Sequence, residues 1–216
     1  MRNQQKIYTI NSFLLILSLF LTSLSSLKTL KKVGFKNITI NGSQLFSEKD
    51  LVNNSSLNVS TRLIFIKTKL IEEELKQNLS LKQVSLKRQI YPFGLKIFIK
   101  TRTPFAYGER VLNGLKISGF IDEEGFFINK HHVEKENLGN LYIQVFGWHE
   151  NFKRRLSKIL TSQNNNDFEL IKVNFSPNGF LTLEEKYLKT IFLGSNPDLL
   201  LTQLQKIKDL KNQLKK

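Results

Sequence analysis

The N-terminal part of the chain contains an uncharged apolar run. No charged residue occurs from Ile7 to Leu27, 21 positions of which twelve are Leu, Ile or Phe. A helix of that length reaches about 32 Å and matches a bilayer core of about 30 Å. The pattern predicts a transmembrane helix over residues 7–27, preceded by a short tail of residues 1–6. A cleaved signal peptide is the alternative, since Arg2 and Lys6 precede the run and the Ser23-Leu24-Ser25 stretch near its end contains small residues.

The next part, residues 33–106, alternates in the order strand, helix, helix, strand, strand. A strand at 35–40 precedes an Asn41-Gly42 turn, and Ser47 with Asp50 forms a loose capping box at a short helix. The second helix places one apolar face toward a sheet, formed by Ile66, Leu70, Ile71, Leu75 and Leu79. Strands at 81–90 and 95–100 follow, joined by a turn at 91–94. Two helices crossing one face of a small sheet are expected.

Residues 107–216 are mostly strand-like. Short strands are predicted at 117–121, 126–128 and 141–146, followed by a helix at 149–160 with Arg155 on its outer side. A three-strand meander at 168–175, 180–183 and 188–193 precedes a last helix with Leu200, Leu204, Ile207 and Leu214 inward and Lys211 near its C-terminal end. The predicted fold class is therefore α+β: a transmembrane helix, a βααββ domain, and a mostly antiparallel β domain with a C-terminal helix.

The charge of the chain is strongly positive and unevenly distributed. There are 33 Lys and Arg against 18 Asp and Glu, a net charge of +15, of which residues 28–106 supply +10. This favours an acidic partner such as anionic lipid, an anionic polymer or nucleic acid. A biased genome rich in Lys, Asn and Ile codons is the alternative explanation. The absence of cysteine excludes disulfides, a thiol nucleophile and a cysteine-based zinc site.

Five short motifs occur in a fixed order along the chain. They are Ile38–Gly42, with Asn41 and Gly42 at a turn; a hairpin at 84–99 containing Arg88 and Pro92; Arg102–Ala106 with Pro104; Ile121–Phe127 with Asp122 and Gly125; and Phe192–Gly194. Together with the anchor and the βααββ unit, this order resembles the bacterial cell-division proteins of the FtsQ/DivIB family. Their βααββ unit is a POTRA domain. Thr101 departs from the resemblance, because an acid usually stands there.

The resemblance implies a non-enzymatic assembly protein of the division machinery. Such a protein is inserted once in the inner membrane, with its N-terminus in the cytoplasm and its bulk outside, and gathers FtsB- and FtsL-like single-pass proteins at the septum. It needs no cofactor, metal, nucleic acid or small-molecule substrate. The motif residues Asn41, Gly42, Arg88, Pro92, Arg102, Pro104, Asp122, Gly125 and Gly194 are then expected to maintain turns and core.

Other functions require sets of residues at spacings that the sequence does not provide. An anchored cell-wall hydrolase needs paired carboxylates, a metal cluster or an activated nucleophile, whereas Glu72–Glu74 suit a solvated helix face and His131-His132 lack a spaced third ligand. A POTRA-containing translocation or envelope assembly factor is a further alternative. Tandem units or a membrane barrel would need more than the roughly 110 residues that follow the first unit. No catalytic, cofactor or metal site is predicted.

The partner site is predicted on a sheet edge. In the FtsQ/DivIB family a further strand usually follows the last helix, and this sequence ends with that helix. The strand at 188–193 is therefore expected to be left as an edge, which is a template for another chain. The candidate partner-binding residues are Lys189, Thr190, Ile191, Phe192 and Leu193. Ile191 and Leu193 are expected to offer an apolar face, and Lys189 to oppose self-pairing.

Overall fold

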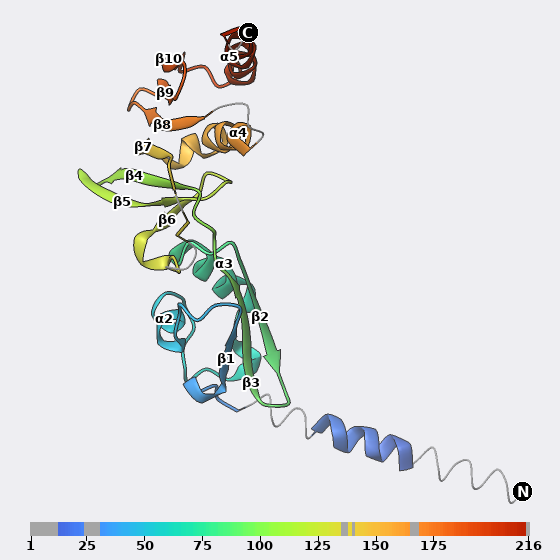
Figure 1. Ribbon diagram of the computed structural model, residues 1–216. Helices are drawn as coiled ribbons and strands as arrows, with labels where there is room; N and C mark the ends of the chain where they lie inside the picture. Colours follow the sequence, from blue (N-terminus) through green and yellow to red (C-terminus); the bar gives the residue numbers. More distant parts are fainter. Residues whose placement is uncertain (1–12, 24–30, 135–137, 140, 165–168, 215–216) are drawn as a thin grey trace, which may run out of the picture. The chain divides into compact units, whose positions relative to one another are not determined.

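The structure is a computed structural model that describes residues 13–23, 31–134, 138–139, 141–164 and 169–214. The chain divides into two compact units, residues 1–100 and 101–216 (Figure 1). This division falls a few residues before the boundary expected at 106. Ala106 is the first residue of a strand in the second unit and is fully buried there.

The first unit contains the predicted βααββ arrangement. Its elements are the 3-10 turn η1 (Phe35–Asn37), β1 (Ile38–Asn41), α2 (Glu48–Asn53), the 3-10 turn η2 (Leu63–Phe65), α3 (Thr68–Asn78), β2 (Gln83–Gln89) and β3 (Gly94–Lys100). The strand order is β1-β3-β2, with β1 parallel and β2 antiparallel to β3. The parallel pair requires a crossover, and the two helices supply it.

Short local signals position the helices of this unit. Ser47 caps α2 as expected: its hydroxyl accepts a hydrogen bond from the Asp50 N–H (3.3 Å), and the Asp50 carboxylate accepts one from the Ser47 N–H (2.8 Å). This reciprocal pair satisfies two donors that a helix N-terminus otherwise leaves free. The hydrogen bonds from the Ser47 side chain and N–H also lower the pKa of Asp50.

The inner face of α3 differs from the predicted face at one position. Ile71 and Leu75 are buried against the sheet, whereas Leu70 is 43% exposed. Ile66 is buried but precedes the helix, which begins only at Thr68. The prediction extended the helical period back to Ile66 and so placed Leu70 on the wrong side. The rest of the face packs with the inward strand residues Ile38, Leu86, Leu95, Ile97 and Ile99 in one core.

The second unit is built on a seven-stranded sheet. Its strands are β4 (Ala106–Leu112), β5 (Leu115–Ile121), β6 (Phe127–Asn129), β7 (Gln144–Trp148), β8 (Leu170–Phe175), β9 (Leu181–Glu185) and β10 (Lys189–Gly194). They lie in the order β10-β9-β8-β7-β4-β5-β6. The pairs β4–β7 and β7–β8 are parallel, and the other pairs are antiparallel. The mostly antiparallel sheet and the predicted meander are confirmed.

Two helices complete this unit. The crossover between the parallel strands β7 and β8 contains a 3-10 turn η5 (Glu150–Phe152) and α4 (Lys153–Asn164), and α5 (Leu200–Leu214) follows β10. Leu156, Ile159 and Leu160 of α4 and Leu200, Leu204 and Ile207 of α5 are buried in one core with the sheet. The apolar periodicity predicted both helices, although α4 begins at Lys153 rather than His149 and the side chain of Leu214 lies outside the described part of the chain. A third 3-10 turn, η3 (Lys130–His132), follows β6.

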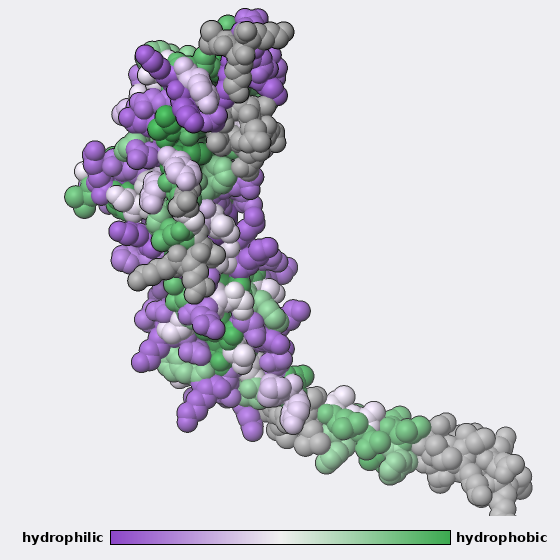
Figure 2. Space-filling model, in the orientation of Figure 1, coloured by the Kyte–Doolittle hydropathy of each residue, from purple (hydrophilic) through white to green (hydrophobic). Residues whose placement is uncertain are grey.

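The apolar N-terminal run is described only in its middle. Residues 13–23 form a helix, while residues 7–12 and 24–27 of the predicted span lie outside the described residues. In Figure 2 this helix presents a largely apolar surface. The exposed fraction of its large apolar side chains ranges from 42% at Leu17 to 66% at Phe13. Among the helices that the structure describes, none is long and apolar enough to cross a membrane.

The corrected face of α3 gives a test in which two leucines of one helix should behave differently. Leu75→Asp places a charge without a partner at a fully buried position, so it should lower the unfolding free energy of the first unit by several kcal/mol. Leu70→Asp should change it by about 0.5 kcal/mol or less. Amide hydrogen exchange of residues 83–100 in the full chain measures both effects. Equal exchange rates in the two variants would contradict this assignment of the helix face.

Candidate functional site

The predicted partner strand, β10, lies at one end of the seven-stranded sheet. It pairs antiparallel with β9, and within the described residues it has no strand on its other side. The register shifts between Phe192 and Gly194, and Lys189 at the start of the strand has a positive φ of 59°. An edge strand leaves backbone donors and acceptors unpaired along its length. The five candidate residues therefore lie together on one sheet edge.

The two faces of β10 differ from the expected arrangement. Leu193 is buried, and Ile191 packs against the same core, so the apolar pair faces the interior. Phe192 points the other way and is 80% exposed, and Thr190 is also exposed. An added strand would meet the edge backbone together with Phe192 and Thr190. Phe192, one of the five candidate residues, is therefore the most accessible apolar group of the strand.

A buried carboxylate fixes the start of β10. The Glu185 side chain, at the end of β9, is fully buried and accepts hydrogen bonds from the N–H groups of Tyr187 (2.7 Å), Leu188 (2.8 Å) and Glu169 (3.2 Å). It also accepts one from the Lys211 ammonium of α5 at 2.8 Å. The β9–β10 turn, the residue before β8 and the last helix are thus joined at one side chain.

The ionised form of Glu185 is stabilised by these donors. Burial opposes ionisation, but the Lys211 ammonium and the three backbone N–H groups outweigh it and lower the pKa of Glu185. Lys211 itself is buried, contrary to the expectation that it lies at a solvated helix end. It follows Leu204 and Ile207 on the inner face of α5, because i+4 and i+7 positions share a helix face.

A second buried cation fixes the end of β10. Arg155 of α4 donates hydrogen bonds to the carbonyl of Gly179 in the β8–β9 turn (3.0 Å) and to the carbonyl of Gly194 (3.2 Å). Burial lowers the pKa of this guanidinium. The sequence placed Arg155 on the outer side of its helix, and that prediction was wrong. The predicted motif residue Gly194 is therefore the point at which α4 is tied to the edge strand.

Two other predicted motifs contact each other in the second unit. Arg102 and Asp122 form a buried ion pair, and the Arg102 guanidinium also donates to the Glu124 carboxylate at 3.1 Å. The same guanidinium lies 3.6 Å from the centroid of the Phe126 ring. Asp122 accepts a hydrogen bond from the Phe126 N–H (2.8 Å) and so closes the β5–β6 turn. These contacts hold the two motifs together at the β5–β6 turn.

The turn glycine of this motif also has a structural reason. Gly125 has φ of +81°, and a Cβ there would lie 2.6 Å from the carbonyl oxygen of Lys153. Its own carbonyl accepts a hydrogen bond from the Trp148 indole N–H at 2.9 Å. Pro104 is buried in the segment that precedes β4.

The motif residues of the first unit lie at turns and loop contacts. A Cβ on Gly42, whose φ is +97°, would lie 2.2 Å from the Ile99 carbonyl oxygen, so the close approach to β3 requires glycine. Arg88 donates to the Ile66 carbonyl at 2.6 Å and holds the loop before α3. Pro92 lies in the β2–β3 turn. Asn41 ends β1, and its Nδ2 is buried without an acceptor in the described part of the chain.

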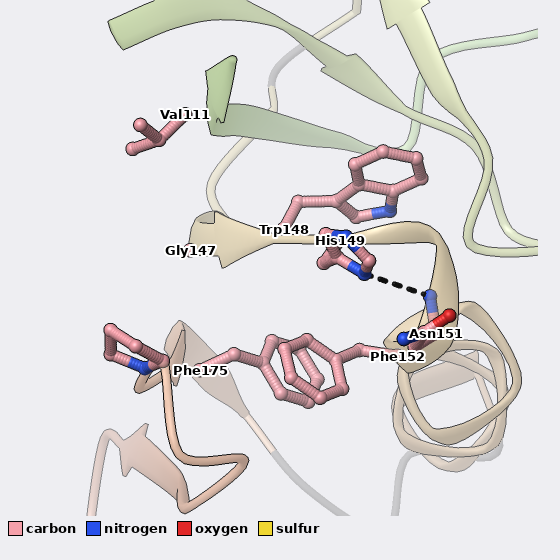
Figure 3. Close-up of a pocket in the computed structure, with 8 residues that line it drawn as sticks. Val111, Gly147, Trp148, His149, Asn151, Phe152 and Phe175 are labelled. Atoms are coloured by element: carbon pink, nitrogen blue, oxygen red, sulfur yellow. Dashed lines mark hydrogen bonds between the residues drawn. The ribbon is translucent and has the colours of Figure 1, made fainter. Parts of the chain in front are cut away.

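An apolar pocket of about 480 Å³ lies at the carboxyl ends of the parallel strands β4, β7 and β8 (Figure 3). The rings of Phe152 and Phe175 stack at 4.8 Å on one side, and Trp148 and Val111 lie on the other. His149 accepts a hydrogen bond from the Asn151 N–H at 3.2 Å. Among the described residues that line this pocket, none carries a carboxylate or an amine. It can accept an apolar group but has no charged residue to orient a reacting one.

The three histidines, which could have supported catalytic or metal-binding chemistry, lie in two separate places. His131 and His132 lie in η3, where burial and then the neighbouring His131 lower the pKa of His132. His149 lies in the apolar pocket. Within the described ranges, no group of three or more His, Asp or Glu residues could hold a metal ion.

The fold of the first unit, a three-stranded β1-β3-β2 sheet covered on one face by two helices, defines a POTRA domain. The family described as POTRA domain, FtsQ-type, matches residues 33–102 of the chain. The chain therefore contains an FtsQ-type POTRA domain, which supports the resemblance to the FtsQ/DivIB family for this part of the sequence. No curated protein matches the chain by sequence.

The Glu185–Lys211 pair generates a prediction about the stability of the second unit. Lys211→Met leaves a buried carboxylate without its counter-ion and should lower the unfolding free energy by about 3 kcal/mol or more. Trp148 is the only tryptophan of the sequence, so urea unfolding followed by its fluorescence reports on this unit alone.

Lys206→Met is the matched control, because Lys206 is an exposed lysine of the same helix. It should change the unfolding free energy by about 0.5 kcal/mol or less. If the Lys211 and Lys206 variants unfolded at the same urea concentration, the buried pair would not hold α5 to the sheet.

Proposed function

We propose that this chain is a non-enzymatic, membrane-anchored assembly protein of bacterial cell division, which recruits FtsB- and FtsL-like single-pass proteins at the septum. The FtsQ-type POTRA domain at residues 33–102 is the observation that carries this proposal. The second unit supports it, because it combines a mostly antiparallel sheet with an edge strand held at both ends by buried charged residues. A rigid edge of this kind suits strand addition by a partner.

Among the four sheet edges that the structure describes, β10 is best suited to strand addition. On the POTRA edge strand β2, the Leu86 N–H is already occupied, because it donates to the Glu72 carboxylate of α3 at 2.5 Å. The edge strands β1 and β6 contain four and three residues. β10 contains six residues and carries an exposed aromatic ring. A partner strand would gain main-chain hydrogen bonds along β10 and a contact with Phe192.

The apolar N-terminal helix supports membrane anchoring. The hydroxyl groups of Ser18, Thr22 and Ser23 donate to carbonyls three residues earlier, at 2.8–2.9 Å. Hydroxyls that are satisfied within their own helix are tolerated in a bilayer, where no water can bind them. Twelve Leu, Ile and Phe residues contribute very roughly −4 to −7 kcal/mol to insertion, as an upper bound. The proposed span is residues 7–27, with the N-terminus in the cytoplasm and residues 28–216 outside.

The anchor can be tested with two arginines in the apolar run. Leu17→Arg with Leu21→Arg should cost about 5–7 kcal/mol at the bilayer centre, enough to offset the favourable insertion energy. The double variant should leave the membrane fraction, and a C-terminal alkaline phosphatase should lose its activity. Leu112→Arg with Leu115→Arg is the matched control, since both leucines are exposed in the second unit. An inactive phosphatase on the unmodified chain would refute the proposed orientation.

The partner edge can be tested at its exposed aromatic residue. Phe192→Glu adds a charge beside the strand without disturbing the core, so the fold should be retained. Placing that charge in the interface should weaken binding of the FtsB-like protein from the same cell about ten-fold or more, as desolvation of an unpaired charge requires. Co-purification and titration calorimetry with the full chain measure this loss.

Tyr142→Glu serves as the control, because Tyr142 is a 73% exposed aromatic residue outside the strands. It should bind the FtsB-like protein as tightly as the unmodified chain. Undiminished binding by a folded Phe192→Glu variant would move the partner site away from β10.

A further inference from the structure

The uncovered face of the POTRA sheet is positively charged, and the three strands as the structure describes them place no acidic residue on it. Residues 96, 98 and 100 of β3 point away from the core, because residues 95, 97 and 99 are buried beneath the helices. The strand register places Thr39 beside Lys96, Ser85 beside Phe98 and Lys87 beside Lys96. We call this surface the open face; its main residues are Thr39, Ser85, Lys87, Lys96, Phe98 and Lys100.

Two lysines of the open face lie where their like charges repel each other. Lys87 and Lys96 lie directly opposite each other on neighbouring strands, where like charges destabilise a sheet. Their ammonium groups lie 5.7 Å and 5.0 Å from the centroid of the same Phe98 ring. Neither lysine forms an ion pair with a carboxylate in the described part of the chain. An external anion would relieve the repulsion between them.

The acidic residues of this domain are all on its other side. Between residues 31 and 100 the acids are Glu48 and Asp50 in α2 and Glu72, Glu73 and Glu74 in α3. Both helices pack on the buried face of the sheet. The domain therefore has a helical side of mixed charge and a sheet side with positive charge only. This asymmetry is complementary to an extended anionic surface.

The position of the domain in the sequence identifies that surface. Only residues 28–32 separate the proposed span from Val33, which is buried in the POTRA core. At about 3.5 Å per residue, the domain begins at most about 20 Å from the end of the span. Three more lysines, Lys28, Lys31 and Lys32, lie in this segment. A tethered surface meets the membrane at high effective concentration, so a few lysines are sufficient for contact.

We propose that the open face of the POTRA sheet docks on the anionic lipid headgroups of the membrane in which the chain is anchored. Lys87, Lys96 and Lys100 bind the headgroups electrostatically, while Phe98, which is 38% exposed, contacts the interface between them. This inference rests on the proposed anchor but not on the partner edge. Docking would hold the domain in one orientation on the membrane.

The absence of cysteine allows this contact to be measured at a single site in the full chain. Thr39→Cys on the open face and Gln77→Cys on α3 each carry a fluorophore, since both positions are exposed. The chain is reconstituted in vesicles of phosphatidylcholine alone or with about one third phosphatidylglycerol, each containing a nitroxide-labelled headgroup as quencher. We expect quenching at residue 39 only in the anionic vesicles, its loss in high salt, and none at residue 77.

Charge variants test the residues responsible. The triple variant Lys87→Gln, Lys96→Gln and Lys100→Gln should lower the ratio of docked to undocked domains about 100-fold, at about five-fold for each lysine. The triple variant Lys49→Gln, Lys69→Gln and Lys76→Gln removes the same charge from exposed positions on or beside the helices and should leave the quenching at residue 39 unchanged. Equal effects of the two triple variants would overturn the proposal.

The other outcomes separate this proposal from the anchor. Flotation of the chain with phosphatidylcholine vesicles reports on the anchor alone. A chain that floats but shows no quenching at residue 39 in anionic vesicles would retain the anchor and refute the docking. A chain that does not float with neutral vesicles, yet is quenched at residue 39 on anionic ones, would refute the anchor and support the docking. A response at residue 39 to a glutamate-rich peptide and not to vesicles would assign the open face to an acidic protein and refute membrane docking.

Discussion

The C-terminal side of the second unit depends on the buried carboxylate of Glu185. Its two oxygens accept four hydrogen bonds, three from backbone N–H groups and one from Lys211. A buried charge is costly unless it is paired and its remaining lone pairs are satisfied, and both conditions hold here. The turn that starts β10 and the helix that follows it can therefore be assembled only together. The four hydrogen bonds of this carboxylate hold the start of the edge strand against both the preceding strand and the last helix.

The periodicity of the sequence places Glu185 and Lys211 on inward faces, although charged residues are not expected there. Leu181, Leu183 and Glu185 occupy successive inward positions of β9, and Lys211 continues the inward face of α5 after Ile207. Periodicity alone places both charged residues inside. Glu and Lys are almost never fully buried unless paired, so Lys211 was expected at a solvated helix end. Arg155 was misplaced for the same reason. A single sequence shows which face a residue lies on, but not the tertiary partner that makes a buried charge tolerable.

The elements with strong local signals could be predicted, and the contacts between distant segments could not. The Ser47 cap, the β2–β3 hairpin and the meander are local in sequence, and the structure contains all three. The parallel pairing of β4 with β7 has no local signal, although a helix between β7 and β8 is typical of a parallel crossover. The motifs around Arg102 and Asp122 were both identified, but only the fold shows that they bind each other.

The distribution of acids bears on the origin of the positive charge. A genome biased toward lysine codons raises the lysine content of every exposed surface, and lysines do occur on both sides of the POTRA domain, as Lys69 and Lys96 show. Codon bias gives no reason for the acids to be confined to α2 and α3, or for two lysines to face each other across β2 and β3. A repulsive pair on a sheet face that also carries Lys100 lowers stability unless an anion binds there. The segregation of charge, rather than its total, is therefore the evidence for an anionic partner of this face.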